Sequence, residues 1–252
     1  MSQSNYYPKT VEEERNQLVV KSNELIQKSR FNLSTSEQKI ILYLISKIKP
    51  SDTEFHEYEF SVADFCRICG ISSQSGSVHS AVKQSVKTLA DKSFWIKQDT
   101  GSELLLRWLQ HAKIENGRIH IQIDQNMKPY LLQLKEKFTR YELIYTLAFK
   151  SQFSIRLYEI LKSYQWCHEV TLELEGLKTS MFAENYKNFK DFRNRVLDVA
   201  VREINQYSDI DVEYEPITKG RKTVALRFMI KDNDVSERVE AYTNCVEALD
   251  NK

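Results

Sequence analysis

The chain contains the stretch LYLISK at Leu42–Lys47 and, about 115 residues later, the similar stretch LYEILK at Leu157–Lys162. A second block keeps the same offset: Val82, Val86, Lys87, Leu89 and Ser93 correspond to Leu197, Val201, Arg202, Ile204 and Ser208. A constant offset shared by two separate blocks indicates an internal duplication. The offset has the length of a small domain, so we interpret the chain as one module used twice.

Composition agrees with two domains of ordinary size in a chain of 252 residues. Hydrophobic residues make up 41% of the chain and charged residues 28%, so each module can bury a core. No apolar run approaches the roughly 20 residues of a membrane-spanning helix, and the polar N-terminus does not resemble a signal peptide. We therefore expect a cytoplasmic protein with reduced thiols and no membrane partner.

The first copy has the pattern of a helix-turn-helix followed by a hairpin. The expected elements are a helix begun by the Ser34/Glu37 capping box and ended by Pro50, a strand near Tyr58–Phe60, helices at Val62–Cys69 and Val78–Asp91, and strands at Phe94–Gln98, Glu103–Ile114 and Arg118–Ile123. A Ser/Gly-rich turn separates the last two helices, and Asn116-Gly117 is a strong hairpin signal. This order is typical of a winged helix.

The second copy repeats that order. Its expected elements are a helix at Ser154–Tyr164, a strand at Val170–Leu172, a helix at Leu174–Met181, a long helix at Asn188–Tyr207, and a hairpin of Ile210–Pro216 with Thr223–Ile230. The sequence therefore predicts an α+β protein of two tandem winged-helix domains related by internal duplication.

Charge and composition suggest four segments. We expect a flexible N-terminal arm at residues 1–17, a first winged-helix domain at 18–137, a second at 138–231, and an acidic tail at 232–252 that could hold a helix at Ser236–Leu249. The net charge of +1 hides a basic stretch, Pro216–Lys231, followed by that acidic tail. The tail could shield the basic stretch or contact a partner, and the sequence leaves both open.

The long helix of the second copy is the best candidate for reading DNA. Its core face is expected to hold Phe189, Phe192, Val196, Ala200, Ile204 and Tyr207. Its opposite face is expected to present Lys187, Lys190, Asn194, Arg195 and Arg202. Asparagine and arginine make bidentate contacts with adenine and guanine, so Asn194 and Arg195 are candidates for base contacts. Asp191 and Asp198 share this surface and oppose purely electrostatic binding. The simpler alternative is a solvated helix face.

The following hairpin favours DNA over that alternative. Lys219, Arg221 and Lys222 lie at its expected tip, where a wing contacts phosphate. The first copy is less basic, with Lys83 and Lys87 on its corresponding helix. Its long hairpin alternates apolar residues through Trp108, which suits pairing with another chain's edge or an ordinary sheet over its own core. We interpret the first copy as contacting the DNA backbone and self-associating.

Metal, cofactor and catalytic patterns are weak. Cys66 and Cys69 have half-site spacing, but neither Cys167 nor Cys245 supplies a second pair, and both cysteines fit the core stripe of a short helix. The chain shows no Gly-rich phosphate loop, and His120 is the nearest approach to the histidine pair of a nicking enzyme. We expect no metal, no cofactor and no catalysis.

Several motifs together resemble the iteron-binding plasmid replication initiators of the theta type. They are Leu18–Leu25, Leu33-Ser34-x-x-Glu37-x-Lys39, Tyr141-Glu142-Leu143, Ser154–Tyr164, and Phe192-Arg193-x-Arg195-Val196-Leu197 running to Asn205. The resemblance covers roughly Leu18 to Ile230 in the same order. The first residues and the acidic tail fall outside it.

That resemblance implies a bacterial protein that binds directly repeated sites in double-stranded DNA at a plasmid origin, opens the duplex and recruits the host initiator and replicative helicase. It also implies a homodimer in equilibrium with monomer, in which the first winged helix dimerises, the second reads the major groove, and the dimer represses its own gene. A winged-helix transcriptional regulator without an origin role is the alternative, and a nicking enzyme is a third reading.

Overall fold

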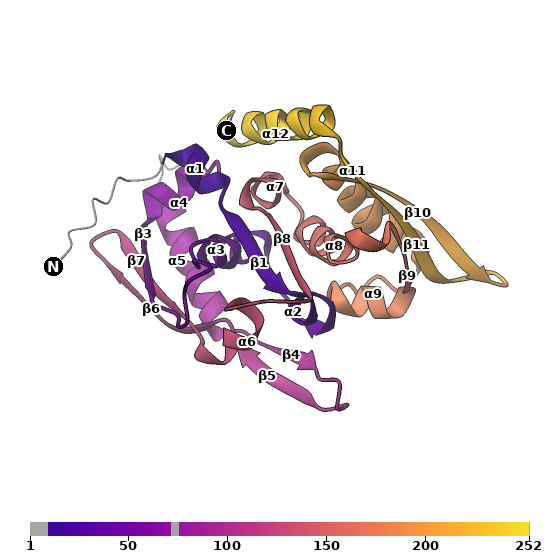
Figure 1. The fold of residues 1–252 in the computed structure, drawn as a ribbon, viewed down its shortest axis with the longest axis horizontal. Helices are drawn as coiled ribbons and strands as arrows, with labels where there is room; N and C mark the ends of the chain where they lie inside the picture. The colour runs from indigo at the N-terminus through magenta and orange to yellow at the C-terminus, as the bar shows by residue number, and fades with distance from the viewer. Residues whose placement is uncertain (1–9, 72–75, 252) are drawn as a thin grey trace.

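Two modules of helices and antiparallel strands lie side by side in the computed structural model, which describes residues 10–71 and 76–251 (Figure 1). In the first module, the helix α3 (Thr35–Ser46) is followed by β3 (Glu57–Ser61), α4 (Val62–Ile68) and α5 (Gly76–Asp91). The predicted capping box is present, because Ser34 Oγ accepts from the Glu37 N–H and the Glu37 carboxylate accepts from the Ser34 N–H. The wing is β6 (Leu109–Glu115) with β7 (Arg118–Ile123).

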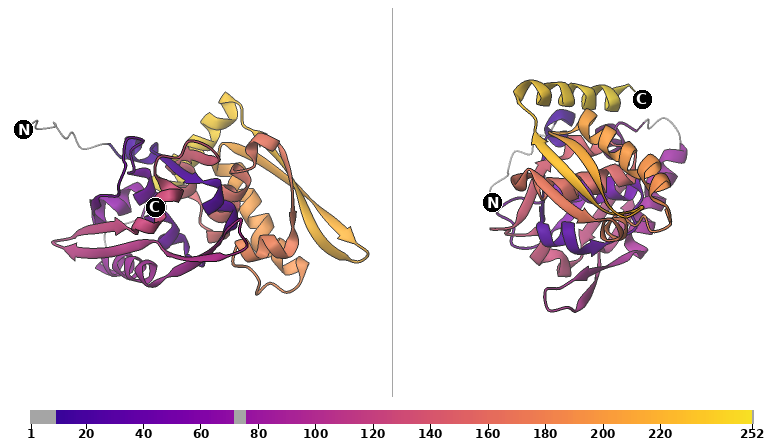
Figure 2. Two further views of the ribbon diagram at one scale, coloured as in Figure 1. Left: turned by 60° about the horizontal axis from the view of Figure 1, so that its bottom comes forward. Right: turned by 90° about the vertical axis from the view of Figure 1, so that its right-hand side faces the viewer.

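The second module repeats this topology. It consists of α8 (Gln152–Lys162), β9 (Glu169–Glu173), α9 (Leu174–Ser180), a long helix from Phe189 to Tyr207, and the wing β10 (Ile210–Lys219) with β11 (Lys222–Asp232). The strand orders β3-β7-β6 and β9-β11-β10 correspond strand for strand. The two copies therefore share one topology, as the duplication predicted. Figure 2 shows the two wings projecting from opposite ends of the molecule.

The expected single strand at Glu103–Ile114 is wrong, because the chain bends there into two sheets. β5 (Glu103–Arg107) pairs with β4 (Ser93–Lys97), which pairs with β2 (Ser29–Arg30), whereas β6 joins the wing sheet. Trp108 lies at the bend, 1% exposed and stacked on Phe94 with ring centroids 4.5 Å apart. Burial of this large ring explains the bend. The β4–β5 hairpin is thus an insertion without a counterpart in the second module.

Short elements precede the first module or lie between the two. They are β1 (Leu18–Ser22), α2 (Asn23–Lys28), the 3-10 turn Gln125–Met127, α6 (Lys128–Leu131), β8 (Phe138–Glu142) and α7 (Leu143–Ala148). Within the second module, the 3-10 turn Gln165–Cys167 joins α8 to β9. β1 pairs antiparallel with β8, so the start of the chain is fastened to the segment that leads into the second copy. No helix in the described ranges is long and apolar enough to cross a membrane.

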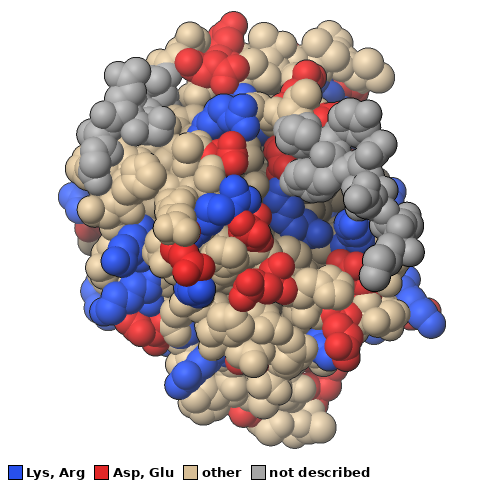
Figure 3. All heavy atoms as spheres, turned by 90° about the vertical axis from the view of Figure 1, so that its left-hand side faces the viewer, with Lys and Arg blue, Asp and Glu red and all other residues tan. Residues whose placement is uncertain are grey.

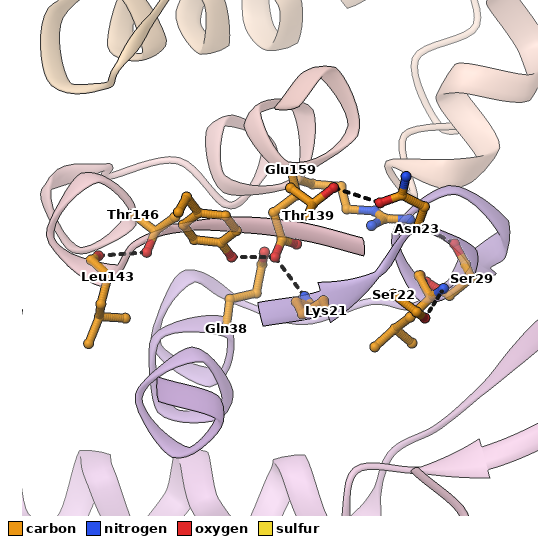
Figure 4. Close-up of polar contacts among 12 residues, drawn as sticks. Lys21, Ser22, Asn23, Ser29, Gln38, Thr139, Leu143, Thr146 and Glu159 are labelled. Carbon is orange, nitrogen blue, oxygen red and sulfur yellow. Dashed lines mark hydrogen bonds and ion pairs between the residues drawn. The ribbon is translucent and has the colours of Figure 1, made fainter. Parts of the chain in front are cut away.

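A polar cluster is buried between the two modules (Figure 4). Lys21 of β1 contacts Glu159 of α8 with Nζ and Oε1 2.6 Å apart, and both side chains are at most 2% exposed. The Tyr141 hydroxyl donates to the same carboxylate oxygen at 2.5 Å. Burial lowers the pKa of Lys21 and raises the pKa of Tyr141, in each case as the largest cause. At the contact between the modules, the buried charges of Lys21 and Glu159 therefore compensate each other.

The expectation of a flexible arm differs from the structure at residues 10–17; residues 1–9 of that arm lie outside the described residues. Thr10 and Glu13 form a capping box that begins α1 (Val11–Arg15). Arg15 is buried and donates to the carbonyl oxygens of Ile68 at 2.9 Å and Arg67 at 3.1 Å. These bonds at the end of α4 explain why the segment is helical and docked.

The acidic tail is a docked helix, α12 (Val235–Asp250), which confirms the helix expected within it. Ala241, Cys245 and Leu249 are buried, and the helix packs on α7 and α11. It starts at the base of β11 and runs back toward α1 and α4, away from the tip of the wing (Figure 1). This position argues against a role in shielding the basic tip.

Candidate nucleic-acid interface

The long helix of the second module is one helix with a widened turn. α10 (Phe189–Phe192) passes into a π-helical turn at Arg193–Leu197 and then into α11 (Asp198–Tyr207). Asn188 caps its start by accepting from the Asp191 N–H at 2.8 Å. In the π turn the Asp198 N–H donates to the Arg193 carbonyl, five residues earlier. A π turn contains one extra residue, so it rotates the side chains before it by roughly 100° relative to those after it.

The core face of this helix agrees with the expectation, with one addition. Phe192, Val196, Ala200 and Ile204 are each 0% exposed, and Phe189 and Tyr207 are partly buried. Leu197 is also 0% exposed, next to Val196, which a uniform helix did not predict. The extra residue of the π turn explains how two neighbours both reach the core.

Two polar contacts fix the helix in the module. The Glu203 carboxylate accepts from the N–H groups of Lys150 and Ser151, at 3.2 Å each, just before α8 begins. The Asn205 side chain both accepts from the Val212 N–H at 2.9 Å and donates to the Val212 carbonyl at 3.0 Å. The helix is thereby locked to the first helix of the module and to the base of the wing.

The predicted polar side chains all lie on the exposed surface of this helix and the loop before it. They are Lys187, Lys190, Asn194, Arg195 and Arg202. Within the described part of the chain, none of these five side chains has a hydrogen-bond or ion-pair partner. Their donor groups are therefore open to solvent.

The tip of the second wing carries the three predicted cations. β10 ends at Lys219 and β11 begins at Lys222, with Gly220 at φ +64° and Arg221 between them. All three side chains are exposed, and none has a side-chain partner among the residues described. Strands of 10 and 11 residues carry this tip well away from the body (Figure 2).

The two candidate cations of the first module lie on one helix, α5. Lys83 and Lys87 are exposed on α5, and Lys87 lies 3.7 Å from Asp91 in an ion pair. The end of the molecule opposite the second wing shows acidic and basic side chains interspersed (Figure 3). Mixed charge of this kind produces a weaker local field than charges of one sign would.

Sequence reasoning missed Arg193 as a candidate. Its Nε lies 3.7 Å from Asp198 Oδ2, and the Tyr214 hydroxyl of β10 donates to Asp198 Oδ1 at 2.5 Å. The spacing of five between Arg193 and Asp198 is not a contact distance on an ordinary helix. The pairing of Arg193 with Asp198 could have been predicted only by knowing that the helix contains a π turn.

The cysteines of α4 belong to the core. Cys66 is 0% and Cys69 1% exposed, and burial raises the pKa of the Cys66 thiol. This confirms that both cysteines lie in the core, as expected. Among the residues described, no cluster of His, Cys, Asp and Glu side chains could hold a metal ion.

The fold and this surface together define a two-module winged-helix DNA-binding protein. Comparison with known families identifies it further. The model for the initiator replication protein WH1 domain matches residues 18–162, and the model for the initiator Rep protein WH2 domain matches residues 173–230. The chain belongs to this family of replication initiators. The predicted family and the two winged-helix domains are confirmed, and so is a DNA-binding role without enzymatic activity.

Two individual proteins illustrate the similarity. A replication initiation protein of Escherichia coli is 26% identical over 226 residues, which are 85% of this chain and 69% of that protein. The crystal structure of the Pi initiator protein in complex with iteron DNA aligns with a TM-score of 0.68 and 19% identity, covering 87% of this chain and 99% of that one. At this identity the second likeness establishes the fold.

Proposed function

We propose that this initiator binds directly repeated sites, or iterons, at a plasmid origin and promotes opening of the duplex. The second winged helix would read the major groove through Lys190, Asn194 and Arg195, with Lys187 and Arg202 beside them. Lys219, Arg221 and Lys222 would bind phosphate across the adjacent groove. The structurally similar Pi initiator protein is seen in complex with iteron DNA, which supports iteron binding by this chain.

The proposal rests on two groups of exposed hydrogen-bond donors that lie on the same module. One group is on the long helix from Phe189 to Tyr207, called the recognition helix from here on, and the other is at the tip of the wing. The recognition helix presents amide and guanidinium groups able to read bases, and the wing presents point charges that need no sequence. Within the described residues these donors have no protein partners. The alternative, that the polar helix face is only solvated surface, does not account for a basic wing tip on the same module.

Partners beyond DNA are also proposed. The β4–β5 hairpin exposes Trp95 by 48% and Leu105 by 50%, and β5 is the open edge of its sheet. Such an edge supports the homodimer expected of the first module, in equilibrium with monomer and able to repress its own gene. In the same module, Lys83 and Lys87 of α5 would contact the DNA backbone. Recruitment of the host initiator and replicative helicase follows from the origin role.

Binding to the DNA beside its own gene tests the function. We expect a preference of about a thousandfold or more for tandem repeats over random DNA, with affinity that falls steeply as salt rises. Titration of labelled duplexes across a salt series measures both. Tight binding to a single inverted repeat in the promoter would instead favour the transcriptional regulator, and equal affinity for all DNA would contradict the proposal.

Substitutions at the two kinds of donor should have different effects. Arg195→Ala should cost about 1–3 kcal/mol on the repeat and relax preference at one base position. Lys222→Ala should weaken all sequences and reduce the salt slope by about one. Lys135→Ala, which removes an exposed lysine before β8, is the matched control and should leave both unchanged. Equal loss for Arg195→Ala on repeat and random DNA would rule out base reading by that residue.

A further inference from the structure

Three side chains link the recognition helix to the wing. Arg193 Nε lies 3.7 Å from one oxygen of Asp198, and the Tyr214 hydroxyl donates to the other at 2.5 Å. Because Tyr214 belongs to β10, the Asp198 carboxylate is held from two elements at once. The Arg193 side chain is 52% exposed, so the end of this chain of contacts faces solvent.

The π turn makes this arrangement possible. On an ordinary α-helix, residues five apart point roughly 140° away from each other, since each residue advances about 100°. Here the Asp198 N–H bonds to the Arg193 carbonyl, and the widened turn brings the two side chains together. π turns often occur at functional sites. Exposed ion pairs add little to stability, so this one contributes little to folding.

We propose that Arg193 reads a base in the major groove and that Asp198 is the positioning residue that aims it. This inference rests on the proposed function. The carboxylate lies against Nε, which leaves both terminal nitrogens of the guanidinium free to donate in parallel. Two parallel donors match O6 and N7 of guanine, so the expected target is a G·C pair. A side chain already oriented also loses less freedom on binding.

The arrangement explains an acidic residue on a surface that meets DNA. An unpartnered carboxylate there would repel phosphate. At Asp198 one oxygen accepts from Tyr214 and the other faces the Arg193 guanidinium, so both are occupied. Asp191 lies on the same helix but bonds to Asn188, at 2.6 Å from its Nδ2. The two aspartates therefore have different roles: Asp198 orients Arg193, and Asp191 holds the side chain of the N-cap residue Asn188.

The test compares four variants on three kinds of DNA. Arg193→Ala, Asp198→Asn, Tyr214→Phe and the control Asp191→Asn are titrated with the tandem-repeat duplex from beside the gene, with every single-base variant of it, and with random duplex, at several salt concentrations. Thermal unfolding of each variant shows that the fold is kept. Asp191→Asn removes one carboxylate charge from the same helix, so it reports the purely electrostatic effect.

We expect Arg193→Ala to weaken binding to the repeat about 5- to 100-fold, with the loss confined to discrimination at one G·C position. Asp198→Asn and Tyr214→Phe should give smaller losses at that same position, and random DNA should change little. Asp191→Asn should leave base preference unchanged. Added to Arg193→Ala, Asp198→Asn should cause no further loss of discrimination, because the residue that it positions is gone.

Two results would overturn the inference. Equal loss of Arg193→Ala on repeat and random DNA, with a salt slope reduced by about one, would make Arg193 a phosphate contact. Tighter binding of Asp198→Asn to all DNA, matching Asp191→Asn, would make Asp198 a mere source of repulsion. Failure of the proposed function is visible in the wild type alone, as equal affinity for repeat and random DNA, and would remove this inference with it.

Discussion

Glu159→Gln is expected to lower the free energy of unfolding by about 3–5 kcal/mol, because it removes the carboxylate charge that faces the buried Lys21 at ion-pair distance. The Lys21 side chain is 2% exposed, and its Nζ lies 2.6 Å from Glu159 Oε1. Glutamine keeps an oxygen that can accept from the Tyr141 hydroxyl, so the change isolates the charge. Urea denaturation monitored by circular dichroism measures the loss.

The double variant Lys21→Met/Glu159→Gln is the control. Replacing both charges of a buried pair by uncharged groups of similar size is often neutral, so most of the lost stability should return. The difference between single and double variants is the coupling energy of the pair. A double variant as unstable as Glu159→Gln would show that packing, rather than an uncompensated charge, causes the loss.

The same variant has an expected dependence on pH. Burial already lowers the pKa of Lys21 below its ordinary value of 10.5, and loss of the Glu159 charge should lower it further. Between the folded and unfolded pKa values, the unfolded chain binds more protons than the native protein. The free energy of unfolding of Glu159→Gln should therefore rise as pH increases toward 10.5. Unfolding curves at pH 7 and pH 9 measure this rise, which should be absent from the double variant.

The order of elements could be predicted from the sequence because its signals are local. The Ser34/Glu37 capping box and the Asn116-Gly117 turn act over a few residues, and both are where they were expected. The duplication then supplied the topology, since two copies of one order indicate one fold used twice. Local rules of this kind do not depend on what lies across the molecule.

Features set by distant contacts could not be predicted. Lys21 and Glu159 are 138 residues apart, and a lysine in a strand of mixed pattern gives no sign of burial. Arg15 forms its bonds with the end of α4, 52 and 53 residues away. In both cases a polar residue is buried because a specific partner satisfies it, and the partner is visible only in the fold.

The candidate site was predicted only in part, because its helical period is a local signal but the π turn that interrupts this period is not. The side chains on the exposed face of the recognition helix follow from a period of 3.6 residues, and that face is where the expectation put it. The π turn breaks the period, so it hid both the burial of Leu197 and the pairing of Arg193 with Asp198. No residue type signals such a turn, because packing on neighbouring elements decides it.

Gly70→Ala is expected to lower the free energy of unfolding by about 2–4 kcal/mol and to release the end of α12. Gly70 ends α4 with φ +62°, a conformation that costs other residues energy. A Cβ at this position would also lie 2.7 Å from Leu249 Cα and closer still to the Leu249 carbonyl oxygen. The backbone of α12 therefore has to move, and the nearby 2.9 Å contact between Arg15 and Asp250 should be disturbed with it.

Gly220→Ala separates the two causes. Gly220 has φ +64° at the wing tip, with nothing within 4 Å of an added Cβ, so it should lose only about 1–2 kcal/mol from backbone strain. Release of α12 has its own readout at Cys245, which is buried and whose thiol has a pKa raised by burial to about 12. A thiol reagent at pH 8, followed by peptide mapping, should label Cys245 at least about tenfold faster in Gly70→Ala than in Gly220→Ala, because exposure restores an ordinary thiol pKa. Equal stability losses with equal labelling would show that α12 is not held against α4. Faster labelling in Gly70→Ala alone would show that close packing of Gly70 of the first module against Leu249 keeps the acidic C-terminal helix docked.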